Sequence, residues 1–147
     1  MKKKQTLDAI SRVENYLLEK YGVEVYYGAG VDNSYYDCIK RIEIDSYQNY
    51  IYRLFSLLHE AGHVHVRNTA FQSFTKAFPH MKVAKRDERI DINHRIDVLR
   101  EEVLAWESAF ELASTLGINL ISDKMSVHRY NCLKTYLEWV RVIILEK

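Results

Sequence analysis

The pattern of apolar and polar positions predicts long helices and short strands. Apolar residues recur every three or four positions, which is the period of an amphipathic helix. The segments with this period are residues 6–21, 47–66, 93–116 and 122–145. Alternating or β-branched and aromatic runs predict strands at residues 23–27 and 38–45, with a loop at residues 28–34 between them. A few strands followed mostly by helices favour an α+β domain.

The ends and connections of these elements have their own signals. Thr6 or Asp8 can cap the first helix, and Gly22 can end it. We expect a further short helix at residues 68–78. Residues 79–91 are polar and charged without a clear period, so we expect an exposed loop there.

Length and composition restrict the class of protein. A chain of 147 residues can bury a sizeable core, and we expect one domain over residues 1–147. The net charge of +1 creates no overall field that would attract nucleic acid or an anionic membrane. Lys2–Lys4 precede no apolar segment of the secretory type, and no run is long enough to span a bilayer. We therefore expect a cytoplasmic protein without nucleic-acid or membrane partners.

The two cysteines give no sign of redox or metal chemistry. Cys38 and Cys132 lie far apart in the sequence and belong to no CxxC pattern. This argues against a disulfide framework or a thiolate site. We expect both side chains to be small, buried and hydrophobic.

The segment with the clearest chemistry is an HExxH sequence at residues 59–63, within the helix predicted at 47–66. Histidines four residues apart lie on one face of a helix, so both rings can approach one metal ion. Glu60 is rotated by about 100° from His59 and can reach a metal-bound water without being a ligand. The motif therefore predicts His59 and His63 as zinc ligands and Glu60 as general base.

An HExxH sequence also arises by chance, and it would then be two histidines and an acid in a purely structural helix. The surrounding RLFSLLHEAGHVHV is strongly apolar, which places the motif in the interior. There, unpaired imidazoles and a carboxylate are costly. Gly62 costs about 1 kcal/mol relative to alanine inside a helix, which indicates the close approach of another element. These features favour the metal site.

A third ligand is expected on the helix predicted at 93–116. At about 100° per residue, its apolar side chains form one arc: Val98, Leu99, Val103, Ala105, Trp106, Ala109, Phe110 and Ala113. Glu102 falls near the middle of this arc. Three other glutamates of the helix fall outside it: Glu101, Glu107 and Glu111. A lone carboxylate on a buried face needs a partner, and a metal ion is a natural one.

Other pairings remain open at this point. Glu102 could instead pair with a buried cation such as Arg53. His65 and His94 are rival ligands. His65 points to nearly the opposite side of its helix from His59 and His63, as expected of a packed histidine. His94 lies at a helix start, where the sequence does not fix its direction.

Three motifs together resemble the ImmA/IrrE-type metallopeptidases of bacteria, phages and mobile elements. They are an I-x-I-D strand, a helix with LLHEAGH, and E-x-x-A from Glu102 to Ala105, and the resemblance covers roughly residues 38–116. It implies a zincin-like minimal metallopeptidase domain, with a small sheet packed on a central HExxH helix and further helices. In these gluzincins two motif histidines and a downstream glutamate bind zinc, which implies His59, His63 and Glu102 as ligands.

The resemblance also implies an activity: hydrolysis of peptide bonds through a zinc-bound water that Glu60 activates. The partner would be a protein or peptide substrate, for example a regulatory protein, since some members cleave repressors. Trp106 after Ala105 departs from the family pattern, and no helix-turn-helix segment is recognisable. The substrate is therefore left open.

The residue that would stabilise an oxyanion is also left open. Its candidates are Tyr130, His128, His65 and His94. We expect the last helix, which includes Tyr136, to be a packing element rather than part of the site.

In an alternative function, the protein binds the metal ion but catalyses no reaction. The chain would then be a catalytically silent zinc-containing binding or regulatory protein, a phage or mobile-element factor that acts on a host protein. Replacing Glu60 by glutamine separates the two, because it abolishes catalysis and spares binding. A regulator that binds nucleic acid through Lys2–Lys4 and residues 82–89 is a weaker alternative, because acidic residues intervene.

Overall fold

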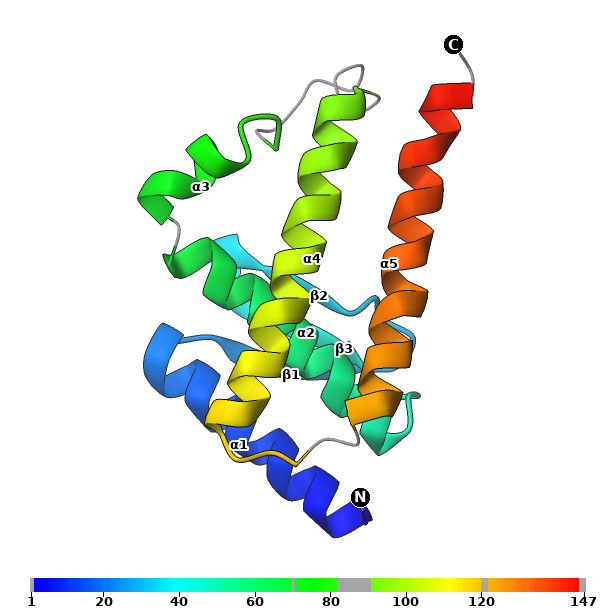
Figure 1. Cartoon of the computed structure of the whole chain (residues 1–147). Coiled ribbons are helices and arrows are strands. Elements are labelled where there is room, and N and C mark those ends of the chain that lie inside the picture. The colour runs from blue at the N-terminus through cyan, green and yellow to red at the C-terminus, as the bar shows by residue number, and fades with distance from the viewer. Residues whose placement is uncertain (1, 70, 82–90, 120–121, 146–147) are drawn as a thin grey trace.

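The computed structural model describes residues 2–69, 71–81, 91–119 and 122–145. Its elements are α1 (Lys3–Tyr21), β1 (Glu24–Gly28), β2 (Ser34–Tyr36), β3 (Arg41–Asp45), α2 (Tyr50–Thr69), α3 (Phe71–Ala77), α4 (Ile92–Thr115) and α5 (Ser122–Leu145). Figure 1 shows a mainly helical structure in which the strands occupy one layer behind the helices. The expected mixed α+β class is confirmed.

The three strands form one small sheet with the order β1-β3-β2. β1 pairs with β3 in parallel and β2 pairs with β3 in antiparallel, so that Val25 and Tyr35 both lie opposite Ile42. Ile42 and Ile44 are fully buried while Arg41 is exposed, as the period-two pattern of β3 predicts. β2 pairs on one side only, so it is an edge strand of the sheet. Residues in and beside β2 border the site described below.

Helix α2 packs against α1, α4, β2 and β3. Because neighbours surround it, its segment from Leu54 to Val66 is buried on most sides. This agrees with the apolar character predicted around most of the circumference of this helix. α4 and α5 lie beside each other and run in opposite directions (Figure 1).

The predicted elements differ from the observed ones mainly at their ends. α1 begins one turn before Thr6, because the Lys2 backbone N–H donates to Gln5 Oε1 at 3.0 Å and so caps an earlier turn. Within residues 38–45 only β3 is a strand. A 3₁₀ turn at Asp37–Ile39, which ends at Lys40 with a φ of 50°, occupies the part before it.

The strand β2 was not predicted, because three residues are too few to show an alternating pattern. The short helix predicted within residues 68–78 is confirmed as α3. Most of the loop predicted at 79–91 lies outside the described residues. The expectation of two buried cysteines was wrong, since Cys38 is exposed and Cys132 is only partly buried.

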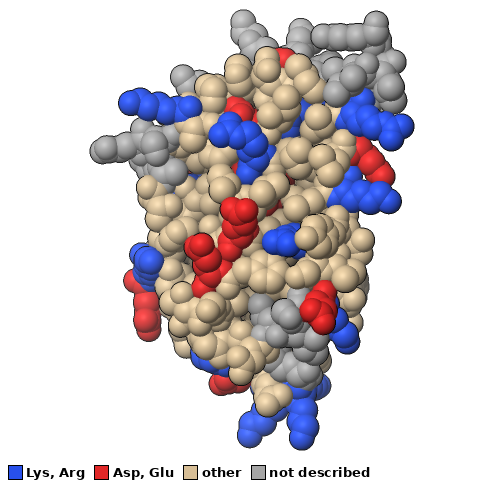
Figure 2. Space-filling view, viewed as in Figure 1, with Lys and Arg blue, Asp and Glu red and all other residues tan. Residues whose placement is uncertain are grey.

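Neither the charges on the face seen in Figure 2 nor the apolar stretches of the helices form an extended patch or a membrane span among the described residues. On the face shown in Figure 2, the described basic and acidic side chains are interspersed rather than gathered by sign. No helix among the described residues contains a stretch long and apolar enough to cross a bilayer.

Candidate metal centre

Side chains of α2 and α4 meet at one point in the interior of the protein. His59 Nε2 lies 3.3 Å from His63 Nε2. Glu102 extends from α4 toward both rings, with Oε2 3.1 Å from His59 Nε2 and Oε1 3.4 Å from His63 Nε2. Each of the three residues offers a ligand atom, and these atoms lie within 4.8 Å of one another. The structure thus brings together the three residues predicted as metal ligands.

A close helix–helix contact makes this meeting possible. Gly62 of α2 touches the backbone of Ala105 in α4, and a Cβ at residue 62 would stand 2.0 Å from the Ala105 carbonyl oxygen. Ala105 lies one turn after Glu102 on the same face of α4. The close approach of another element at Gly62, which the sequence predicted, is thus confirmed. It lets α4 bring the Glu102 carboxylate within reach of both histidines.

The separations of these atoms fit a tetrahedrally coordinated zinc ion. Ligand atoms about 2.0–2.1 Å from such an ion lie about 3.3 Å from one another, close to the distances between His59, His63 and Glu102. Glu102 Oε2 is also buried and lacks a hydrogen bond of acceptable geometry, although it lies 3.1 Å from His59 Nε2. A buried carboxylate oxygen without a donor is costly, and a cation would satisfy it.

The electrostatics of the site also favour a cation. Burial alone would raise the pKa of Glu102, but the neighbouring His59 and His63 rings hold this pKa far below its usual range. Burial likewise opposes protonation of His63, yet Glu101 and Glu102 raise the pKa of that ring. Protons on the His63 imidazole therefore oppose the charge of these two carboxylates in the metal-free protein. Binding of a divalent cation would displace them.

Glu60 lies next to these atoms and is not one of the mutually close ligand groups. Its side chain is 6% exposed and borders the same pockets as His59 and Glu102. Burial raises the pKa of Glu60, while the two neighbouring histidines oppose this increase. No hydrogen bond joins its carboxylate to another residue in the described part of the chain, which leaves it available to a bound molecule.

The structure corrects the expectation for Glu101. This residue was predicted to lie outside the buried arc of α4, but it is 3% exposed, and its Oε1 lies 3.2 Å from His63 Nδ1. Arg67 Nε donates to the same oxygen at 2.7 Å. Asp97, one turn earlier, is also buried, because the His80 backbone N–H and Arg100 donate to it. The buried face of α4 is therefore displaced from the predicted apolar arc: it includes Asp97 and Glu101, whereas Val103 of that arc is exposed.

Trp106 is a second residue whose role in the site the sequence did not reveal, since it was predicted only to belong to the apolar arc. Its ring is stacked on His59, with centroids 4.3 Å apart and an angle of 19° between the planes. The indole is almost fully buried, and His59 Nδ1 has no hydrogen-bond partner. Packing on Trp106 therefore orients His59. A signal existed in the sequence, since Trp106 lies one turn after Glu102 on the same helix face.

A pocket of about 500 Å³ opens beside His59, Glu60 and Glu102. One wall comes from α5 and consists of His128, Asn131, Cys132, Thr135 and Tyr136. The expectation that the last helix only packs against the protein was therefore wrong. These side chains show no motif in the sequence, because only the position of α5 against α4 brings them to the pocket.

The rival residues lie elsewhere or have other partners. Arg53 donates to the Ser46 and Gln48 carbonyl oxygens rather than to Glu102. His65 Nδ1 lies 2.9 Å from the Tyr21 hydroxyl, and His94 Nδ1 lies 2.8 Å from the His80 carbonyl oxygen. Tyr130 is 63% exposed. Of the four residues predicted as oxyanion donors, only His128 lines the 500 Å³ pocket.

Comparison with known proteins identifies no relative: no protein family matches the chain, and no curated protein or solved structure matches it significantly.

Proposed function

We propose that this protein is a zinc-dependent peptidase of the ImmA/IrrE type, with His59, His63 and Glu102 as zinc ligands and Glu60 as general base. The observation that carries the proposal is the meeting of the three ligand groups within 4.8 Å. Glu60 stands beside them, at a pocket large enough for a peptide segment. The donor set of two imidazoles and one carboxylate is the one used by catalytic zinc sites of the gluzincin type.

When bound, a zinc ion would polarise the scissile carbonyl and lower the pKa of a coordinated water to about 7. The Glu60 carboxylate accepts the proton that the attacking water loses as its oxygen bonds to the carbonyl carbon. Glu60 then returns this proton to the amine as the C–N bond breaks, so that water is consumed and no charge accumulates. Burial suits Glu60 to this exchange, because it raises the pKa of the carboxyl and so helps it hold the proton.

Tyr136 is the best placed residue to stabilise the developing oxyanion. It lines both pockets that contain Glu60 and Glu102. Burial and then the charge of Glu102 raise its pKa, so the phenol keeps its proton and can donate it in a hydrogen bond. His128 lines the first pocket only, and its ring packs against Tyr52, Phe55 and Trp106. Tyr136 therefore replaces the four residues proposed from the sequence.

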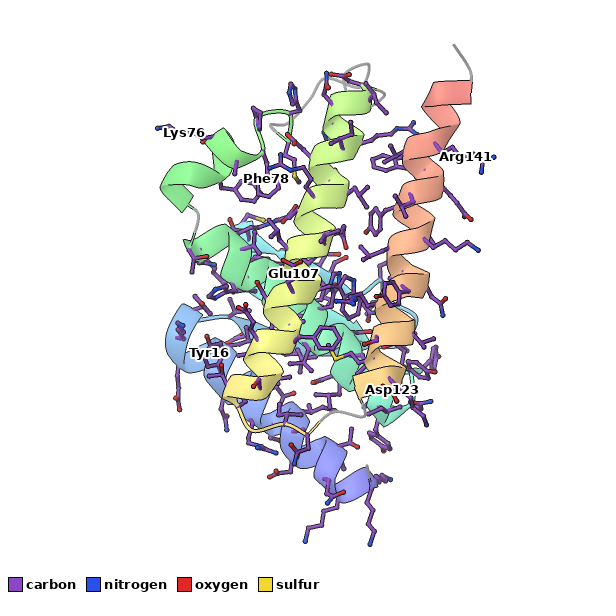
Figure 3. All side chains as sticks on the ribbon, viewed as in Figure 1. Tyr16, Lys76, Phe78, Glu107, Asp123 and Arg141 are labelled. Carbon is purple, nitrogen blue, oxygen red and sulfur yellow. The ribbon has the colours of Figure 1, made fainter. Side chains whose placement is uncertain are left out.

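The proposal is tested first by metal content. Protein purified without an affinity tag should contain about one zinc per chain, and His59→Ala, His63→Ala and Glu102→Ala should each lose it. Glu107→Ala is the matched control, because Glu107 lies on the exposed face of the same helix (Figure 3). An absence of zinc after loading and removal of the excess would contradict the metal site.

Catalysis is tested separately with the zinc-loaded protein. A peptide library prepared by digestion of a bacterial lysate should yield new termini with wild-type protein and none with Glu60→Gln, which should still bind zinc. Zinc binding without any cleavage of the peptides would contradict the proposed peptidase activity. That outcome would favour the alternative of a silent zinc-containing binding protein.

A further inference from the structure

The two histidines of the site are held in different ways. The Nδ1 atom of His59 is buried without a hydrogen-bond partner, and its ring is held by stacking on Trp106. The Nδ1 atom of His63 instead faces a carboxylate, Glu101 Oε1, at 3.2 Å. The orientation of the first ring is thus set by packing, and that of the second by a hydrogen bond.

The carboxylate that faces His63 is itself fixed on two sides. Arg67, one turn further along α2, donates from Nε to Glu101 Oε1 at 2.7 Å and from Nη2 to Oε2 at 3.4 Å. The Glu101 side chain is 3% exposed, whereas that of Arg67 is 33% exposed and lies 5.8 Å from the centre of the Tyr35 ring. Glu101 therefore has little freedom to leave His63.

An ionised carboxylate accepts hydrogen bonds and cannot donate them, so the ring nitrogen that faces Glu101 must carry a hydrogen. In a neutral imidazole the other nitrogen then has the free lone pair. That atom is His63 Nε2, which faces His59 and Glu102. A histidine that binds metal through one nitrogen commonly donates from the other in this way.

We propose that Glu101, held by Arg67, is a positioning residue that fixes the Nδ1–H form of His63 and so presents His63 Nε2 to the metal. This inference rests on the proposed zinc site and adds a specific role for a residue outside the ligand set. Glu101 also adds one buried negative charge, and Arg67 adds one positive charge. These two charges offset each other, so the pair supports His63 without leaving an unbalanced charge beside the site.

The test compares zinc affinity in the wild type, Glu101→Ala, Glu101→Gln and the exposed control Glu107→Gln, by competition with a chelator of known affinity. Circular dichroism checks that each variant is folded. We expect Glu101→Ala to weaken zinc binding about 10- to 100-fold. Glu101→Gln should recover part of this loss, because its amide oxygen can still accept the hydrogen bond, and Glu107→Gln should match the wild type.

A second measurement reads the hydrogen bond at His63 Nδ1, since coordination of zinc through Nε2 by itself requires the Nδ1–H form. The ¹⁵N shifts of the imidazole nitrogens in zinc-loaded protein should show His63 protonated at Nδ1 in the wild type, with this signal shifted or broadened in Glu101→Ala. If Glu101→Ala cannot be purified in folded form, Glu101→Leu, which removes the hydrogen-bond acceptor and keeps most of the side-chain volume, carries the test through the same two measurements.

The outcomes separate the two proposals. Wild type that binds zinc, with a Glu101 variant of equal affinity and an unchanged His63 signal, overturns the positioning role and leaves the zinc site standing. Wild type that binds no zinc overturns the proposed function and this inference with it. Weaker binding together with a changed His63 signal supports both.

Discussion

Gly62 and Ala105 are in backbone contact where α2 crosses α4: a Cβ at residue 62 would stand 2.0 Å from the carbonyl oxygen of Ala105 and 2.8 Å from its carbonyl carbon. Backbone atoms cannot rotate away as a flexible side chain can. The spacing of the two helices, and with it the distance from Glu102 to both histidines, depends on the absence of a side chain at this position.

We expect Gly62→Ala to destabilise the protein by about 1–3 kcal/mol, because the added methyl group forces α2 and α4 apart. Helix propensity acts in the opposite direction, since alanine in a helix interior is about 1 kcal/mol better than glycine. Urea unfolding measures the net effect, with the exposed Ser11→Ala of α1 as control. A more stable Gly62→Ala protein would contradict the close contact.

Tyr136→Phe should lower kcat on the order of 10²-fold, because it removes one hydrogen-bond donor to the oxyanion. Zinc content should stay at the wild-type value, since Tyr136 is not among the ligand groups. Tyr130→Phe, on the exposed side of the same helix, is the control and should leave kcat unchanged. Equal kcat in Tyr136→Phe and wild type would exclude the tyrosine as donor.

Alkylation of Cys132 should block the pocket. This thiol lines the same pocket as His59 and Glu60, and burial raises its pKa, so its reaction with iodoacetamide should be slow. Cys38 is exposed and would react first, so the experiment uses Cys38→Ser protein. Peptidase activity should fall as mass spectrometry shows modification of Cys132, while activity of a Cys132→Ser chain should resist the reagent. Full activity after complete modification of Cys132 would contradict its position in the pocket that holds the peptide.

Tyr27 should make stability depend on pH in alkaline solution. Burial, and then the hydrogen bond that its hydroxyl donates to Glu14 Oε1 at 2.5 Å, raise the pKa of Tyr27 above the unfolded value of about 10. The folded state therefore holds this proton more tightly than the unfolded state. The resulting stability is present in full below pH about 10 and decreases as the pH rises above it.

Urea unfolding at pH 8 and pH 11 measures this contribution as the difference between wild type and Tyr27→Phe. Between the two pH values the wild type should lose about 1.4 kcal/mol more than Tyr27→Phe, which corresponds to one pH unit above the unfolded pKa. Tyr26→Phe, on the exposed side of the same strand, is the matched control. A constant difference at both pH values would mean that Tyr27 titrates alike in the folded and unfolded chain.

The sequence was most informative where a periodic pattern runs over many residues. The long helices and the meeting of Glu102 with the HExxH histidines followed from spacing, because one helical period fixes which residues share a face. Glu101 shows the limit of this reasoning. Its burial depends on contacts with α2, where Arg67 donates a hydrogen bond to its carboxylate and His63 faces it. Apolar periodicity cannot reveal a face that is buried by ion pairs and hydrogen bonds.

The residues of α5 show a second limit. His128, Cys132 and Tyr136 follow a helical period. Of these, only His128 was a candidate from the sequence, which gave no reason to separate Cys132 and Tyr136 from ordinary packing residues. They line the pocket because α5 lies against α4, and that placement arises from contacts between residues far apart in the chain.

By itself, the sequence determined the helices, the sheet strand β3 and the identity of three potential zinc ligands with a neighbouring base, because these depend on local spacing. Only the tertiary structure decided that Glu101 and Arg67 support His63, that Trp106 stacks on His59 and that Tyr136 faces the site. Each of these relations joins segments whose distance in space is set by helix packing, such as the contact of Gly62 with Ala105, and no local pattern encodes that distance.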